Sequence, residues 1–355
     1  MKRIAVIISM FLVVFAFPKD KKNIKDWWNS GIPTIEVYKE STDKLPIIKV
    51  KGARFVNCDG DTILFRGVNI ADPDKLDDLG LWNKDFFLSI KKLGANIIRI
   101  PVHPYAWRQR GKDEYLRLLD KAVKYCSEYD IYIIIEWHSI GNLVLEIFQD
   151  YYHKTTKAET FDFWRTIAIR YNGHSTIAFY ELFNEPAVKG GQFGPMSWHE
   201  WKELVEKMII LIRAYDPETV ILVGGLDWAY DLTHVKYDPV NAENIGYVTH
   251  PYPFKRKEPW EPKWEENFGF LARKYPVLAT EIGFWLGPSE EITKNHYAYR
   301  IIKYLEKRGI GWLAWIYDDK WMPALLKSYD GYKLNKVGEF FKKALKGEIQ
   351  KEFSE

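Results

Sequence analysis

The chain has 355 residues, of which 47% are hydrophobic, and this length and composition predict a globular protein with a large core. Its 51 basic and 48 acidic residues are scattered along the sequence and give a net charge of +3, which argues against a nucleic-acid-binding groove. Aromatic residues make up 16% of the chain, so we expect some of them to do more than pack.

The first residues predict an export signal. A basic start precedes the apolar segment Ile4–Phe17, which is too short to span a bilayer, and the chain turns polar from Pro18. We therefore expect residues 1–17 to be a signal peptide of a secreted protein, residues 18–46 an N-terminal extension and residues 47–355 a single domain. A leader that stays uncleaved and anchors the chain in a membrane is the alternative.

The two cysteines, Cys58 and Cys126, imply no disulfide framework, although a single bridge between them stays open. Cys126 shares a predicted helix face with Leu118, Leu119 and Ala122, which makes it first of all a core residue. Abundant Lys, Glu and Ile beside few Gln favour a thermophilic source.

The first regular element after the extension is a predicted N-terminal β-hairpin. Residues 47–51 and 54–65 alternate apolar and polar side chains around the turn residues Asp59 and Gly60.

Eight short apolar runs then predict buried strands, and amphipathic helices alternate with them. The strands cover residues 64–69, 97–102, 131–137, 177–183, 220–223, 245–249, 277–280 and 311–316. The helices cover residues 85–94, 113–129, 161–171, 197–215, 264–274, 293–309 and 337–345. This α/β rhythm favours a (β/α)8 TIM barrel. The rival is a doubly wound sheet, but no Gly-rich phosphate-binding turn follows the first strand.

Polar side chains gather where the predicted strands end. In a (β/α)8 barrel these carboxyl ends face one shared cleft, so residues far apart in the sequence meet there. The strand-end residues include Arg99, His103, Glu136, His138, Asn184, Glu185, His250, Tyr252, Glu281 and Trp315.

Two carboxyl groups with an arginine, histidines and aromatic platforms are the set that glycosidic bond cleavage needs. One carboxyl must stay protonated to donate to the leaving oxygen, while the other stays ionised to attack the anomeric carbon. We expect Arg99 to lower the pKa of one carboxyl and burial to raise that of the other. Aromatic faces suit the C–H faces of sugar rings.

At these residues the chain resembles family 5 of the clan A glycoside hydrolases, the cellulase and mannanase family, over about residues 47–345. The resemblance implies that Glu185, in Asn-Glu-Pro, is the acid/base and that Glu281 is the nucleophile. One local departure is Ser139, which follows His138 where the family often has Asn.

The resemblance also implies roles for the other strand-end residues. Arg99 and Tyr252 would hold Glu281, His138 and Asn184 would bind sugar, His250 would orient the acid/base and Trp315 would form the floor of the cleavage subsite. We add His103 and Trp285 as expected substrate-binding residues.

The sequence thus predicts a retaining, endo-acting hydrolase of β-1,4-linked glucan that works by double displacement. We expect its carboxyls about 5–5.5 Å apart, a β-linked polysaccharide or oligosaccharide as substrate, no metal or cofactor, no membrane contact in the mature form and a monomer. Alternatives are a β-mannanase or an exo-β-glucosidase on the same barrel, and a non-catalytic carbohydrate-binding barrel.

Other tryptophans divide into two groups. Six fall in predicted strand-to-helix loops, and we expect about half of them at the cleft: Trp82, Trp107, Trp228, Trp260, Trp285 and Trp321. Three fall in helical patterns, where we expect packing: Trp164, Trp198 and Trp201. The run His199-Glu200 resembles the start of a zinc-protease helix but lacks its second histidine, so we expect no metal there.

Overall fold

The computed structural model describes residues 35–39, 45–187, 191–287 and 289–354. The predicted signal peptide and most of the predicted extension lie outside the described residues. Glu36–Glu355 form one compact unit. Within the described ranges, no helix combines the length and the apolar character needed to cross a bilayer.

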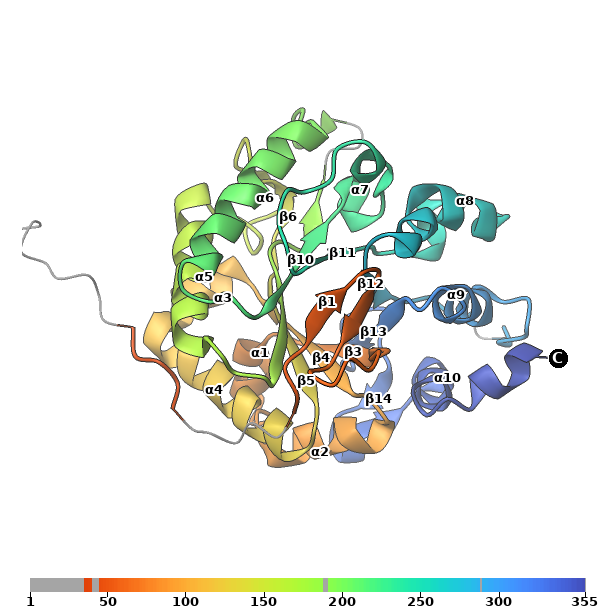
Figure 1. Ribbon diagram of the computed structural model, residues 1–355. Helices are drawn as coiled ribbons and strands as arrows, with labels where there is room; N and C mark the ends of the chain where they lie inside the picture. Colours follow the sequence, from red (N-terminus) through yellow and green to blue (C-terminus); the bar gives the residue numbers. More distant parts are fainter. Residues whose placement is uncertain (1–34, 40–44, 188–190, 288, 355) are drawn as a thin grey trace, which may run out of the picture. The chain divides into compact units, whose positions relative to one another are not determined.

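Eight parallel strands close into a barrel, which confirms the predicted (β/α)8 fold (Figure 1). Around the barrel the order is β10, β11, β12, β13, β3, β4, β5, β8. All eight predicted strands are found, with bounds within two residues of those expected. They are β3 Arg66–Ile70, β4 Ile97–Val102, β5 Tyr132–Trp137, β8 Ile177–Glu181, β10 Val220–Gly224, β11 Ile245–Val248, β12 Val277–Ile282 and β13 Gly311–Tyr317.

Helices surround the strands and bury one apolar face against them (Figure 1). Predicted end signals are present: Ser197 caps α6 through a reciprocal bond with Glu200, and Gly94 ends α2 at a φ of 104°. The helices are α1 Pro73–Asp78, α2 Lys84–Leu93, α3 Pro104–Arg110, α4 Lys112–Glu128, α5 Lys157–Tyr171, α6 Trp198–Arg213, α7 Leu226–Ala229, α8 Trp260–Asn267, α9 Tyr297–Glu306 and α10 Lys336–Leu345.

The predicted helix over residues 264–274 is wrong in its bounds. The structure has α8 up to Asn267 and a separate 3-10 turn, Gly269–Arg273, because the backbone leaves the helical region at Phe268, with φ −149° and ψ −30°. The helix predicted from residue 293 starts at Tyr297, where the ring of His296 caps it by accepting from the Ala298 amide.

The hairpin closes the amino-terminal end of the barrel. Strands β1 Lys49–Lys51 and β2 Arg54–Val56 pair antiparallel, and Phe55 packs edge-on against Phe179 at 4.9 Å between ring centroids. The predicted turn at Asp59 and Gly60 is present, since Val56 pairs antiparallel with Thr62 across it and the φ of Gly60 is 87°. An additional turn at Gly52, whose φ is 59°, joins β1 to β2. Side chains of the hairpin thus fill the amino-terminal end of the barrel.

Short strands form small sheets outside the barrel. β6 Ile140–Asn142 pairs with β7 Ile147–Phe148 and with β9 Glu185–Pro186, which ties the loops after β5 and β8 together. β14 Leu326–Ser328 pairs with β15 Lys333–Leu334. Both cysteines are free, so Cys58 and Cys126 form no disulfide with each other. Cys58 is exposed, whereas Cys126 is buried on α4, which confirms the predicted core position of Cys126.

Candidate active site

A buried arginine organises the carboxyl end of the barrel. The guanidinium of Arg99, at the centre of β4, donates to both oxygens of Glu181 at 2.9 and 2.7 Å, to Glu281 Oε1 at 2.7 Å and to Asn184 Oδ1 at 2.7 Å. Its Nη2 atom also lies 3.7 Å from Glu136 Oε2. These charge-assisted bonds compensate for the buried positive charge and fix three strand-end carboxyls relative to one another.

Glu281 is held from two sides at the end of β12. Its Oε1 accepts from Arg99 Nη1 at 2.7 Å, and its Oε2 accepts from the hydroxyl of Tyr252 at 2.8 Å. The residue is 4% exposed. The carboxyl borders the cleft and accepts a hydrogen bond at each oxygen, so it is held in one orientation, as a nucleophile requires.

Glu185 lies on β9, opposite Glu281, and pairs with a histidine. Its Oε1 lies 3.1 Å from Nδ1 of His250, and that nitrogen is also 3.7 Å from Glu281 Oε2. One carboxylate oxygen of Glu185, one of Glu281 and a nitrogen of His250 all lie within 4.8 Å of one another. The two carboxyl groups therefore face each other across a narrow gap.

The hydrogen bonds of His250 favour the doubly protonated ring. Its Nε2 lies 3.0 Å from the hydroxyl of Thr280, whose own proton goes to Glu181 Oε1 at 3.2 Å, so the hydroxyl accepts from Nε2. Burial alone would lower the pKa of His250, but the nearby charges of Glu281, Glu181 and Glu185 outweigh it and raise the pKa to about 9.

The pKa of Glu185 differs from expectation. Burial works to raise it, but the His250 imidazole and the Lys255 ammonium outweigh burial and lower the pKa of this carboxyl below its ordinary value. The expectation that burial would keep one carboxyl of the pair protonated is thus wrong for Glu185. The proton resides on His250 instead, at hydrogen-bond distance from Glu185 Oε1.

Two adjoining hollows form the cleft. The carboxylate hollow, about 510 Å³, is lined by residues that include Asn184, Glu185, Tyr252, Glu281, Trp228 and Trp285. The histidine hollow, about 630 Å³, is lined by residues that include Asp72, His103, His138, His153 and Trp321. His138, Ile140 and Trp315 line both hollows, so the two form one continuous cleft.

All ten predicted site residues lie in this cleft or directly beneath it. Seven of them line the carboxylate hollow, and Arg99 and His250 are buried beneath it in contact with Glu281 and Glu185. The tenth, His103, lies in the histidine hollow, where its ring centroid is 4.4 Å from that of His138. Trp315 and the ring of His138 are parallel within 10° at 5.8 Å. Trp285 is 51% exposed at the rim.

The loop tryptophans divide as expected. Trp228, Trp285 and Trp321 line the cleft, whereas the other three pack: Trp82 and Trp107 are buried, and Trp260 stacks on Trp264. Trp164, Trp198 and Trp201 are buried, as predicted.

Several site residues were missed. Glu181 lies within the apolar run that was recognised as a strand, and a charged residue in a fully buried strand is itself a signal. Asn69, at the end of β3, accepts from Arg99 at 3.0 Å and follows the same strand-end rule as the residues that were found. Lys255 gave no signal, because its neighbours Arg256 and Lys257 suggested an exposed loop tip.

A closed (β/α)8 barrel with two facing carboxyls, a buried arginine and an aromatic cleft at its carboxyl end defines the class of (β/α)8 glycoside hydrolases. Within that class, the profile described as cellulase (glycosyl hydrolase family 5) matches residues 56–320. The chain belongs to glycosyl hydrolase family 5.

Solved structures agree with this assignment. A beta-glucanase from Saccharophagus degradans is 40% identical, with a TM-score of 0.86, over 91% of this chain and 99% of that one. A structure of that enzyme in complex with cellotetraose is 39% identical, with a TM-score of 0.86 and the same coverage.

Among curated relatives, Endoglucanase E-5 of Thermobifida fusca is 28% identical over 237 residues, which are 63% of this chain and 46% of that protein. Endoglucanase A of Butyrivibrio fibrisolvens is 27% identical over 217 residues, 58% of this chain and 45% of that protein. The chain spans about half the length of these two relatives.

Proposed function

We propose that this chain is a retaining, endo-acting β-1,4-glucanase. The observation that carries the proposal is the narrow gap between Glu185 and Glu281, whose nearest oxygens and a nitrogen of His250 lie within 4.8 Å of one another. Carboxyls about 5–5.5 Å apart suit retention through a covalent intermediate, whereas inversion needs about 6.5–9.5 Å to admit a water.

In the first step Glu281 attacks the anomeric carbon, and the bond from that carbon to the leaving oxygen breaks. Hydrogen bonds from Arg99 and Tyr252 orient the carboxylate for this attack. Glu185 supplies a proton to the leaving oxygen. In the second step Glu185 takes a proton from water, the water oxygen attacks the anomeric carbon, and Glu281 leaves as a carboxylate.

The His250 and Glu185 pair holds the proton for the first step. A cationic imidazole beside a carboxylate contains the same number of protons as a neutral imidazole beside a carboxylic acid, so transfer across the 3.1 Å contact makes Glu185 the acid without a change of net charge. Substrate binding favours this transfer, because it expels water and disfavours separated charges.

The cleft supports an extended sugar chain. Trp315 lies between the two hollows beside His138 and offers a ring face where both hollows meet, and Trp228, Trp285 and Trp321 offer further faces along the cleft. The beta-glucanase that binds cellotetraose and the endoglucanase relatives support a β-glucan substrate and endo action.

The test compares wild type with Glu281→Gln on cellulose, mixed-linkage glucan, mannan and xyloglucan. Gln keeps the shape but cannot form the glycosyl ester, so we expect reducing-sugar release from glucans to fall about 10⁴-fold or more, with cellotetraose binding retained. A carbohydrate-binding barrel would give no release with wild type. Release from mannan alone, or only terminal products from a long oligosaccharide, would contradict the β-1,4-glucanase or the endo assignment.

We further propose that the protein is exported, monomeric and heat-adapted. The basic start and short apolar segment support export. N-terminal sequencing of the secreted protein tests cleavage near residue 17, and an intact leader in a membrane fraction would favour the anchored form. Light scattering tests the monomer, and a Tm above the mesophilic range of about 45–65 °C tests heat adaptation.

A further inference from the structure

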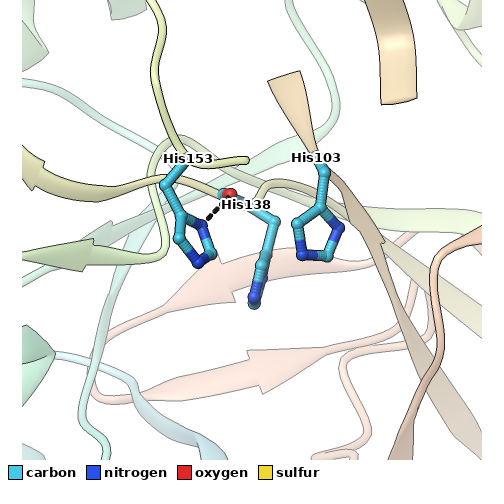
Figure 2. Close-up of side chains that lie close together, drawn as sticks. All are labelled: His103, His138 and His153. Atoms are coloured by element: carbon cyan, nitrogen blue, oxygen red, sulfur yellow. Dashed lines mark hydrogen bonds between the residues drawn. The ribbon is translucent and has the colours of Figure 1, made fainter. Parts of the chain in front are cut away.

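Three histidines form a cluster on one wall of the histidine hollow. His103 follows β4, His138 follows β5 and His153 lies in the loop between β7 and α5, and we call these residues the histidine triad. Figure 2 shows their rings side by side. One ring nitrogen of each lies within 4.8 Å of the others.

Each ring of the histidine triad is anchored through the same atom, Nδ1. That of His103 lies 2.9 Å from Asp72 Oδ2, and that of His138 lies 2.8 Å from Glu136 Oε2. That of His153 lies 3.0 Å from the carbonyl oxygen of His138 (Figure 2). Asp72 is itself fixed by the hydroxyl of Tyr115 at 2.8 Å. A carboxylate or carbonyl behind Nδ1 is the arrangement that orients a metal-binding imidazole.

The anchoring leaves the three Nε2 atoms for a ligand. Within the described part of the chain, Nε2 of His103 and of His138 makes no hydrogen bond, and Nε2 of His153 has Asp150 Oδ2 at 3.8 Å. A cation at Nε2 of His138 requires the proton shared with Glu136 to lie on Nδ1. Glu136 is then a carboxylate, with the Arg99 guanidinium 3.7 Å away.

The carboxylate hollow contains a second group of possible ligands, Glu185, His250 and Glu281, but it is unsuited to a metal. Both nitrogens of His250 are engaged as donors, and its pKa of about 9 keeps the ring positively charged. The guanidinium of Arg99 adds a second positive charge beside Glu281.

We infer that the histidine triad is a binding site for a divalent transition-metal ion of the zinc, copper and nickel type. Three imidazoles on one zinc ion have their nitrogens about 3.3 Å apart at Zn–N distances of about 2.0–2.1 Å, so the three rings would move closer together when the ion binds. The open hollow leaves room for a water or for Asp150 as the fourth ligand.

Occupancy of this site would oppose sugar binding, a consequence that rests on the proposed function. His138 and Trp315 line both hollows, so a glucan chain that continues from the carboxylate hollow would meet the ion and its ligands. The ion would therefore act as an inhibitor that competes with substrate, and metal binding itself does not depend on the activity.

The test is titration of the metal-free, tag-free full chain with Zn²⁺ by calorimetry, and with Co²⁺ by visible absorption. We expect one ion per chain with a tetrahedral Co²⁺ spectrum, binding that weakens as the pH falls, and weaker binding in the presence of cellotetraose. His153→Asn removes Nε2, while its amide can still donate to the His138 carbonyl. This variant should lose at least about tenfold in affinity.

The matched control is His199→Asn, which removes an exposed histidine on α6 that lies 3.4 Å from Glu203. It should bind Zn²⁺ as the wild type does. The proposal is overturned if the wild type binds no Zn²⁺ at millimolar concentration, if His153→Asn binds as tightly as wild type, or if the control loses the site. A wild-type chain that binds no Zn²⁺ but cleaves glucan normally would overturn this inference and leave the proposed function standing.

Discussion

Two buried histidines of the cleft, His250 beside the carboxyl pair and His138 in the histidine triad, have pKa values shifted in opposite directions. His250 is fully buried beneath the carboxylate hollow and has three glutamates around it, which raise its pKa to about 9. His138 is 4% exposed, has other histidines beside it, and its pKa is lowered well below the ordinary value. Burial is common to both, so the neighbours decide the sign.

The largest effect that we predict in this comparison comes from Glu185→Gln. The amide cannot take the proton of His250 and pass it to the leaving oxygen. Substrates with poor leaving groups should lose about 10²–10⁴-fold in kcat, because no group then protonates the leaving oxygen. An aryl glycoside with an activated leaving group should lose much less in its first step. Burst kinetics on both substrates check this, and equal losses on the two would contradict the acid role of Glu185.

The contributions of His250 and His138 to the free energy of unfolding should depend on pH in opposite directions. The pKa of His250 in the folded state lies above its unfolded value near 6.5, so its contribution is complete below pH 6.5 and is lost as the pH rises to about 9. This is about 3 kcal/mol, at about 1.36 kcal/mol per pKa unit. The pKa of His138 is lowered, so its contribution is present above pH 6.5 and is lost as the pH falls.

Denaturant unfolding of wild type, His250→Asn and His138→Asn across pH 4–10 measures this contrast. We expect the alkaline loss of stability to flatten only in His250→Asn and the acid loss to flatten only in His138→Asn. Parallel curves for all three proteins would mean that neither ring has a shifted pKa.

The smallest predicted effect is that of Lys255→Met. Lys255 lies with its ammonium 3.2 Å from the Asp227 carbonyl and helps to lower the pKa of Glu185. Removing this charge should shift the alkaline limb of the kcat/KM profile to higher pH by about half a unit, because the proton of the His250 and Glu185 pair is then held more tightly. Lys257→Met, at an exposed position two residues later, should leave the profile unchanged.

The barrel could be predicted because short stretches of sequence are enough to identify each of its strands. Apolar runs such as Ile97–Val102 are both strand-like and buried, and their spacing leaves one reasonable architecture. The Asp59-Gly60 turn of the hairpin region was predictable for the same reason, whereas the additional turn at Gly52 between β1 and β2 was not identified from the sequence.

The residues that form the candidate site could be predicted, but the protonation states of their side chains could not. A strand-end rule brings Glu185, His250 and Glu281 to one cleft. Whether burial or a neighbour determines each pKa depends on contacts of about 3 Å between side chains that are distant in sequence, such as His250 with Thr280 and Glu185. The histidine triad was missed for the same reason, since His153 lies in a loop whose path the sequence does not give.

The Arg99 network has a consequence for redesign of the enzyme. One guanidinium contacts side chains from β3, β8 and β12, so any exchange within this set alters several partners at once. The rim loops that present Trp228, Trp285 and Trp321 lie outside that network of hydrogen bonds. Laboratory evolution toward other polysaccharides should therefore accumulate changes in those loops and leave the guanidinium and its partners untouched.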